Sequence, residues 1–153
     1  MKKALFSAIL SVGLLFLAGA AAHAQTVNGS IGAVKRGGST RGTVTLRIPG
    51  GLHVNSNRPN SQYAIPTTVK ISAVGAKTGG VSYPRGRNRK FQFSEEMLNV
   101  YEGSATFSFN LTVPANFKGN AVKVRVVVRY QACTEEVCYP PKTKEVVLTA
   151  AVR

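Results

Sequence analysis

Acidic residues are scarce in this sequence, and aspartate is missing altogether. The 153 residues include 20 lysines and arginines but only six acidic side chains, all of them glutamates, and the formal net charge is +14. Without aspartate a Ser-His-Asp triad is excluded, although a glutamate could take its third position. In a cytosolic protein so basic a sequence would suggest nucleic acid as the ligand. The N-terminal segment argues for export instead, so we expect no nucleic-acid partner and interpret the charge as a solvated basic surface.

Metal ligands are scarce as well. The sequence has two histidines, two methionines and two cysteines, and His53 is the only histidine beyond residue 24. Cys133 and Cys138 do not have the spacing of a zinc site. Neither a glycine-rich phosphate loop nor a paired-carboxylate pattern is found. We therefore expect no metal centre and no bound cofactor.

The long apolar run of the sequence stands at its N-terminus. A positively charged start is followed by an apolar run over residues 4–20 and by the small-x-small cleavage site Ala22-His23-Ala24. This order is typical of a secretory signal peptide. A retained transmembrane helix is disfavoured, because the run is short for a span and the cleavage site is good. We predict that residues 1–24 are cleaved off. Residues 25–153 should then form one soluble domain outside the cytoplasm, without stable membrane insertion.

Beyond the signal segment, apolar and polar residues alternate with a period of two. This period is typical of β-strands with one buried face, and glycines and prolines separate the segments. The absence of tryptophan excludes the Cys-Trp-Cys pattern of antibody domains. We predict an all-β domain, an immunoglobulin-like antiparallel β-sandwich of about 7–9 strands. The candidate strands are residues 43–48, 68–72, 104–113, 121–130 and 144–149, with shorter ones at 29–34, 79–82 and 90–93.

The two cysteines lie five positions apart, at Cys133 and Cys138, after the strand predicted at residues 121–130. In an exported protein such a pair is either a structural clip or a reversible redox switch. Because the enclosed loop is short, a disulfide there would stabilise the fold by only ~2 kcal/mol in the chain-entropy model. A chain of this size can also bury a core without a disulfide. These arguments favour the switch and leave the clip open.

The alternation of side chains along the strand at residues 121–130 predicts which face Cys133 is on. The even-numbered residues of that strand should face the core, namely Val122, Val124, Val126, Val128 and Tyr130. In an unbroken strand Cys133 would point to the opposite, charged face, whereas a bulge would invert its direction. Residues 134–137 are then a four-residue hairpin loop, and Cys138 begins the returning strand.

Three segments of the sequence resemble one known family. Tyr130-Gln131-Ala132-Cys133 and Cys138-Tyr139-Pro140-Pro141 resemble the active-site hairpin of the N-terminal periplasmic domain of the thiol:disulfide interchange protein DsbD. Residues 51–59 resemble its Gly-x-His-x-Asn-Ser segment, and residues 99–103 resemble its Val-Tyr-Glu-Gly segment. The resemblance extends from about residue 40 to residue 152 and is most specific at the cysteine hairpin.

The resemblance implies an immunoglobulin-like domain with a reversible Cys133–Cys138 disulfide and protein-disulfide reductase activity in the periplasm. As in the family, Cys138 would form the mixed disulfide with a partner and Cys133 would resolve it, which fits general thiol–disulfide exchange. The implied partners are a thioredoxin-like or membrane-embedded thiol reductant and oxidised periplasmic proteins.

The resemblance also points to residues around the cysteines. An aromatic cap loop would shield the disulfide, and Phe91 or Phe93 could supply it, although both could equally be core residues of a short strand. Tyr139 and His53 are expected near the site. His53 and Asn55 stand where some members have tyrosines near the active site. His53 either tunes a thiol or has a structural role.

The sequence departs from the multidomain members of the family. It contains no further membrane section and no thioredoxin domain, so we expect a stand-alone form whose reductant is a separate protein. This leaves the direction of electron flow open. The alternative function is a non-catalytic envelope module, for binding or scaffolding, with a structural disulfide. A chaperone that exposes a free sheet edge is a further possibility.

Overall fold

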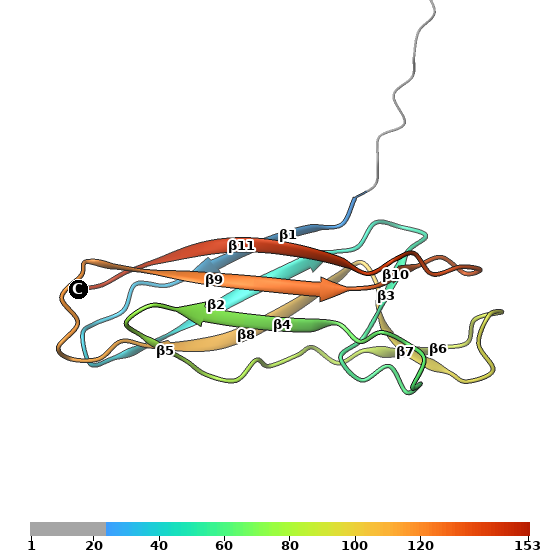
Figure 1. The fold of residues 1–153 in the computed structure, drawn as a ribbon, viewed down its shortest axis with the longest axis horizontal. Helices are drawn as coiled ribbons and strands as arrows, with labels where there is room; N and C mark the ends of the chain where they lie inside the picture. Colours follow the sequence, from blue (N-terminus) through green and yellow to red (C-terminus); the bar gives the residue numbers. More distant parts are fainter. Residues whose placement is uncertain (1–23) are drawn as a thin grey trace, which may run out of the picture.

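Antiparallel strands build the part of the protein that the computed structural model describes, residues 24–153 (Figure 1). The predicted signal peptide lies outside the described residues except for Ala24. Within residues 24–153 there is no helix, and therefore none long and apolar enough to cross a membrane. The predicted fold class, an all-β immunoglobulin-like sandwich, is confirmed.

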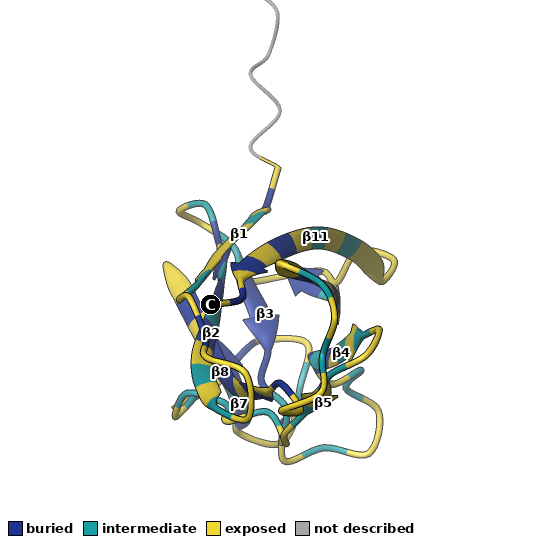
Figure 2. Ribbon diagram, turned by 90° about the vertical axis from the view of Figure 1, so that its left-hand side faces the viewer, coloured by how far each residue is buried: buried dark blue, intermediate teal, exposed yellow. Residues whose placement is uncertain are grey.

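Two sheets face each other and enclose the main core (Figure 2). One sheet has the order β1-β2-β8-β5 and the other the order β11-β9-β4. Their strands are β1 (Thr26–Ile31), β2 (Ser39–Arg47), β8 (Ser104–Thr112), β5 (Lys77–Thr78), β11 (Lys142–Ala151), β9 (Ala121–Tyr130) and β4 (Thr68–Ala73). Figures 1 and 2 both place β1 beside β11, so the two sheets approach each other along this edge.

The third sheet extends from one end of the sandwich and has the order β10-β3-β7-β6 (Figure 1). Its strands are short: β10 (Ala132–Cys133), β3 (His53–Asn55), β7 (Leu98–Tyr101) and β6 (Arg87–Arg89). A second, smaller hydrophobic cluster of Phe91, Leu98 and Val100 lies here, apart from the main core. Both cysteines belong to this end of the molecule.

The main core follows the predicted alternation of side chains. All five even-numbered residues of β9 are buried, from Val122 to Tyr130, as predicted. In β8, Ala105, Phe107, Phe109 and Leu111 are buried in the same way and face them across the sandwich. This burial of apolar surface from two sheets is the main stabilising contribution to the domain.

Eleven strands are present in residues 24–153, more than the predicted seven to nine, because four of them have only two or three residues. The strand predicted at residues 90–93 is wrong: the pairing residues are those of β6, and the chain turns at Gln92 and Phe93. The segment at residues 79–82 contributes only the isolated bridge between Ser82 and Ser108.

Candidate functional site

A disulfide-linked hairpin forms the centre of the candidate site. Cys133 at the end of β10 pairs with Cys138 across the hairpin, and their sulfurs form a disulfide with the Cα atoms 3.9 Å apart. The Thr134 amide donates to the Val137 carbonyl at 2.8 Å, and the Tyr139 amide donates to the Ala132 carbonyl at 2.9 Å. The chain therefore reverses within residues 134–137, the predicted four-residue loop.

The two sulfur-bearing residues differ sharply in exposure. Cys133 is completely buried, whereas Cys138 is exposed. The exposure expected for Cys133 on the charged face of an unbroken strand is not found. The strand breaks at Gln131, where the chain leaves the sheet of β9 and joins the sheet of β3. Ala132, like Tyr130, belongs to the main core, so Cys133 points away from that core, and β3 and the returning chain flank it on both sides.

His53 lies directly opposite Cys133 in the pairing of β3 with β10. Directly opposite residues of an antiparallel pair point to the same side of the sheet, so His53, Cys133 and Cys138 form one row across three chain segments. The imidazole is only 2% exposed, and its Nε2 has no hydrogen-bond partner within residues 24–153. Burial lowers the pKa of His53, although the charges of Glu135 and Glu102 oppose the shift. The imidazole is therefore neutral at pH 7.

Phe91 and Phe93 lie beside this row, in the turn between β6 and β7. The Phe91 ring stacks on the His53 ring with centroids 4.0 Å apart and is 2% exposed, within the small cluster formed with Leu98 and Val100. The Phe93 ring lies 5.4 Å from that of Phe91 and is 40% exposed. Phe91 is thus a core residue that packs on His53, and Phe93 lies outside it, partly exposed at the wall of a pocket.

Tyr139 follows Cys138 in the sequence but faces a different hollow. It lines a shallow depression together with Gln25, Leu52 and Ala132, on the other side of the hairpin. Neighbouring residues of an extended segment point in opposite directions, which explains the separation. Its backbone remains part of the site, because the Tyr139 carbonyl accepts a hydrogen bond from Gln131 Nε2 at 3.2 Å.

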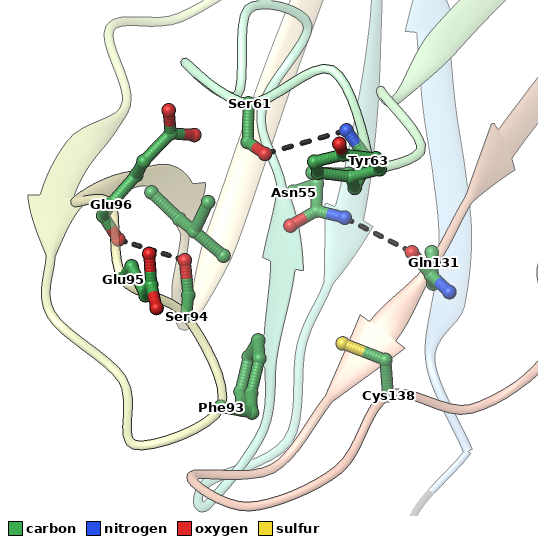
Figure 3. Close-up of a pocket in the computed structure, with 11 residues that line it drawn as sticks. Asn55, Ser61, Tyr63, Phe93, Ser94, Glu95, Glu96, Gln131 and Cys138 are labelled. Carbon is green, nitrogen blue, oxygen red and sulfur yellow. Dashed lines mark hydrogen bonds between the residues drawn. The ribbon is translucent and has the colours of Figure 1, made fainter.

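A pocket of about 400 Å³ opens beside Cys138, and we call it the Cys138 pocket (Figure 3). It lies between the hairpin, the loop after β3 and the loop before β7. Its walls combine apolar and polar side chains. The lining residues are Asn55, Ser61, Tyr63, Ala64, Phe93, Ser94, Glu95, Glu96, Leu98, Gln131 and Cys138.

Asn55 is the buried polar residue of this pocket, and it is not among the site residues predicted from the sequence. Its Nδ2 donates to the Ile65 carbonyl at 3.1 Å and to Gln131 Oε1 at 3.2 Å. Its Oδ1 is buried and has no partner within the described residues. Asn55 stands two residues after His53 on β3 and therefore shares its face of the sheet. The spacing of two residues from His53 is the sequence signal that could have indicated Asn55.

Arg89 ties the hairpin loop to the third sheet and is also absent from the sequence predictions. Its guanidinium pairs with Glu102 at 2.5 Å and with Glu135 of the hairpin loop at 3.2 Å. The same group lies 5.6 Å from the centre of the Phe91 ring. One side chain thus connects β6, the end of β7 and the cysteine loop.

No cluster of three or more histidine, cysteine or acidic residues that could hold a metal ion occurs within residues 24–153. The covalent bond at this site that a thiolate could attack is the Cys133–Cys138 disulfide. The exposed Cys138 is the sulfur within reach of another molecule.

Comparison with known proteins gives matches along most of the chain. The family model described as "Thiol:disulfide interchange protein DsbD, N-terminal" matches residues 24–150. The thiol:disulfide interchange protein DsbD of Haemophilus ducreyi is 25% identical over 104 residues, which are 68% of this chain and 17% of that protein. The chain thus spans less than a fifth of the length of this curated relative.

Two solved structures from Neisseria meningitidis are also similar. One is the reduced form of the DsbD N-terminal domain, with 24% identity, 82% of this chain and 85% of that chain covered, and a TM-score of 0.46. The other is a complex between the DsbD N-terminal and the PilB N-terminal domains, with 23% identity, coverage of 79% and 80%, and a TM-score of 0.48.

Proposed function

Because this chain belongs to the family of DsbD N-terminal domains, we propose that it exchanges thiols and disulfides with other proteins through a reversible Cys133–Cys138 bond. The observation that carries the proposal is the unequal exposure of the two cysteines beside the Cys138 pocket. An inert bridge would not need one sulfur at a pocket wall. An exchange site needs one sulfur that a partner can reach and a second that completes the reaction.

The order of the steps follows from that exposure. In the oxidised domain a partner's thiolate attacks the Cys138 sulfur, and Cys133 leaves as a thiolate, which takes up a proton. A second thiolate of the partner then attacks the partner's own sulfur in the mixed disulfide, which forms the partner's disulfide and releases Cys138 as a thiolate. The domain now holds two thiols, and it passes these two electrons on when the Cys138 thiolate attacks the disulfide of an acceptor. Cys133 then attacks the mixed disulfide and releases the reduced acceptor.

Location and partners belong to the same proposal. The signal-like N-terminus and the family support action in the periplasm after cleavage near residue 24. A thioredoxin-like or membrane-embedded thiol protein would supply the electrons, and oxidised periplasmic proteins would receive them. Phe93 lines the same pocket as Cys138 and is partly exposed, so it would contact an incoming partner.

Single-cysteine variants test the order of attack with glutathione disulfide as the probe. We expect Cys133→Ser to form a stable glutathione adduct at Cys138, because the exposed thiol has no resolving neighbour. We expect Cys138→Ser to form little or none, because Cys133 is buried. Intact-mass spectrometry in a defined redox buffer measures both. Adducts on neither variant, or equally on both, would refute the assignment.

A redox titration separates exchange from the alternative of a structural clip. Structural disulfides have midpoint potentials below about −300 mV, and exchange-competent pairs lie higher. We expect this domain to lie in the higher range. A value below that limit would instead support a non-catalytic envelope module.

A further inference from the structure

We propose that the Cys138 pocket binds a lysine or arginine side chain that neighbours the reactive cysteine of the partner, and thereby selects partners with basic surroundings at that cysteine. The proposal rests on the thiol exchange proposed above and names the chemistry of its substrate. It follows from three features of the pocket.

The first feature is the shape and position of the pocket. Cys138 forms part of its wall, so the chain of a partner joined to that sulfur must pass its mouth. Ala64, Leu98 and Phe93 supply apolar surface inside it. The methylene stem of a lysine or arginine packs well on such surface while its charged end reaches a polar group.

The second feature is the unused oxygen of Asn55. The Asn55 amide nitrogen is already committed to two acceptors, the Ile65 carbonyl and Gln131 Oε1, and this fixes the orientation of the amide. In Figure 3 its oxygen points away from Gln131, into the space that the lining residues enclose. An oxygen can only accept, and a buried acceptor without a partner costs about 1–3 kcal/mol. A ligand that donates an N–H group to Asn55 Oδ1 removes this free-energy penalty.

The third feature is the charge at the rim. Glu95 and Glu96 line the pocket, and neither carboxylate forms an ion pair within residues 24–153. The nearby ammonium of Lys90 donates to the backbone oxygen of Glu95 and not to its carboxylate.

The acidic rim contrasts with the rest of a strongly basic chain. Five of the six glutamates belong to the pocket rim, the hairpin loop or the Arg89 ion pairs, and only Glu145 lies elsewhere, paired with Arg125. Because salt screens charges beyond about 8 Å at physiological ionic strength, a side chain in the pocket meets the carboxylates of Glu95 and Glu96 more than the distant net charge. A cation is therefore favoured there.

Short peptides with one activated cysteine test this preference directly. The fully reduced domain reacts with blocked peptides whose cysteine carries a thionitrobenzoate group, and whose neighbouring residue is arginine, norleucine or glutamate. In one series of peptides that residue precedes the cysteine, and in the other series it follows the cysteine. The Cys138 thiolate attacks the peptide sulfur and expels thionitrobenzoate. Cys133 then releases the peptide thiol and restores the disulfide, so that two electrons pass from the domain to the peptide disulfide.

Stopped-flow absorbance of thionitrobenzoate gives the second-order rate constants. In at least one series we expect the arginine peptide to react about fivefold faster than the norleucine peptide, and the glutamate peptide to be the slowest. The double variant Glu95→Gln/Glu96→Gln should remove most of this preference, measured as the ratio of the arginine to the norleucine rate constant. Glu145→Gln, which removes a carboxylate on β11, should leave the preference intact and serves as the control.

The outcomes separate this inference from the proposed function. Equal rates for arginine and norleucine peptides in both series would overturn the basic-side-chain pocket while leaving thiol exchange in place. A preference that survives the double variant would overturn the assignment to this pocket. Failure of every peptide to react would overturn both.

Discussion

His53 is the residue whose environment departs most from what its chemistry prefers. A histidine in water is free to take up a proton near pH 6.5. Here the imidazole is buried between β10 and Phe91, its Nε2 lacks a partner within residues 24–153, and burial lowers its pKa. The folded state therefore resists protonation of His53, whereas the unfolded chain does not.

This difference predicts a pH dependence of stability. Between the lowered pKa of folded His53 and about pH 6.5, the unfolded state binds more protons, so acid favours unfolding there. The stabilisation is complete above about pH 6.5 and is lost as the pH falls through the folded pKa. We expect the free energy of unfolding to decrease from pH 7.5 to pH 5, and to decrease less in His53→Phe.

Urea unfolding of both proteins across this pH range measures the effect. His53 is the only histidine beyond residue 24, so no other histidine of residues 25–153 contributes. The Arg125 ion pair lowers the pKa of Glu145, which therefore titrates below this window. An equal decrease in wild type and variant would contradict the account.

Single residues were predictable from the sequence where their chemistry is unusual. The two cysteines and the lone histidine stand out by type, and the resemblance added Phe91 and Phe93. Gln131 and Arg89 did not stand out, and Asn55 was noted only by its place in the resemblance, because asparagine, glutamine and arginine are common surface residues. Their importance comes from partners that are distant in the sequence, such as Glu135 for Arg89 and Ile65 for Asn55.

At the scale of elements, the ion pairs of Arg89 connect β6 to the cysteine hairpin. Both are partly exposed, so each contributes only about 0.2–1 kcal/mol to stability. Their effect on the hairpin should be larger than their energy suggests, since they restrain the loop that carries Cys138.

Arg89→Met tests this restraint by keeping the apolar stem and removing the charge. We expect the free energy of unfolding to fall by about 1 kcal/mol or less. We also expect dithiothreitol to reduce the disulfide several-fold faster, because the hairpin moves more freely. Arg125→Met breaks the exposed pair between β9 and β11 and is the matched control. Reduction rates that change equally in both variants would show that Arg89 has no local role.

Long strands were predictable and short ones were not. β8 and β9 bury every second residue over nine and ten residues, which leaves a clear period in the sequence. β3 has three residues, all buried, and β10 has two, so no alternation identifies them. The break at Gln131 leaves no local signal either, because the change of sheet depends on β3, which lies far away in the sequence.

At the scale of the whole molecule, the disulfide lies outside the main core. The two facing sheets pack around Val124, Phe107 and their neighbours, while the cysteines belong to the third sheet. Reduction should therefore leave the sandwich intact, which any repeated exchange cycle requires.

We expect reduction to lower the free energy of unfolding by only ~2 kcal/mol, the value for a loop of this length. Far-UV circular dichroism should be unchanged, and denaturant unfolding should remain a single cooperative transition. Loss of that transition on reduction would identify the bond as a structural staple. The double variant Cys133→Ser/Cys138→Ser, which cannot form the disulfide, is the control.

The position of Gln131 limits the insertions and deletions that the junction between β9 and β10 can tolerate. It is the single residue between β9 and β10, and its side chain accepts from Asn55 and donates to the Tyr139 carbonyl. Deleting or inserting one residue here would exchange the two faces of β10. Cys133 would then turn away from both His53 and Cys138, even with every side chain of the hairpin retained. A substitution of Gln131 would remove two hydrogen bonds, whereas a change in residue number would separate the two cysteines.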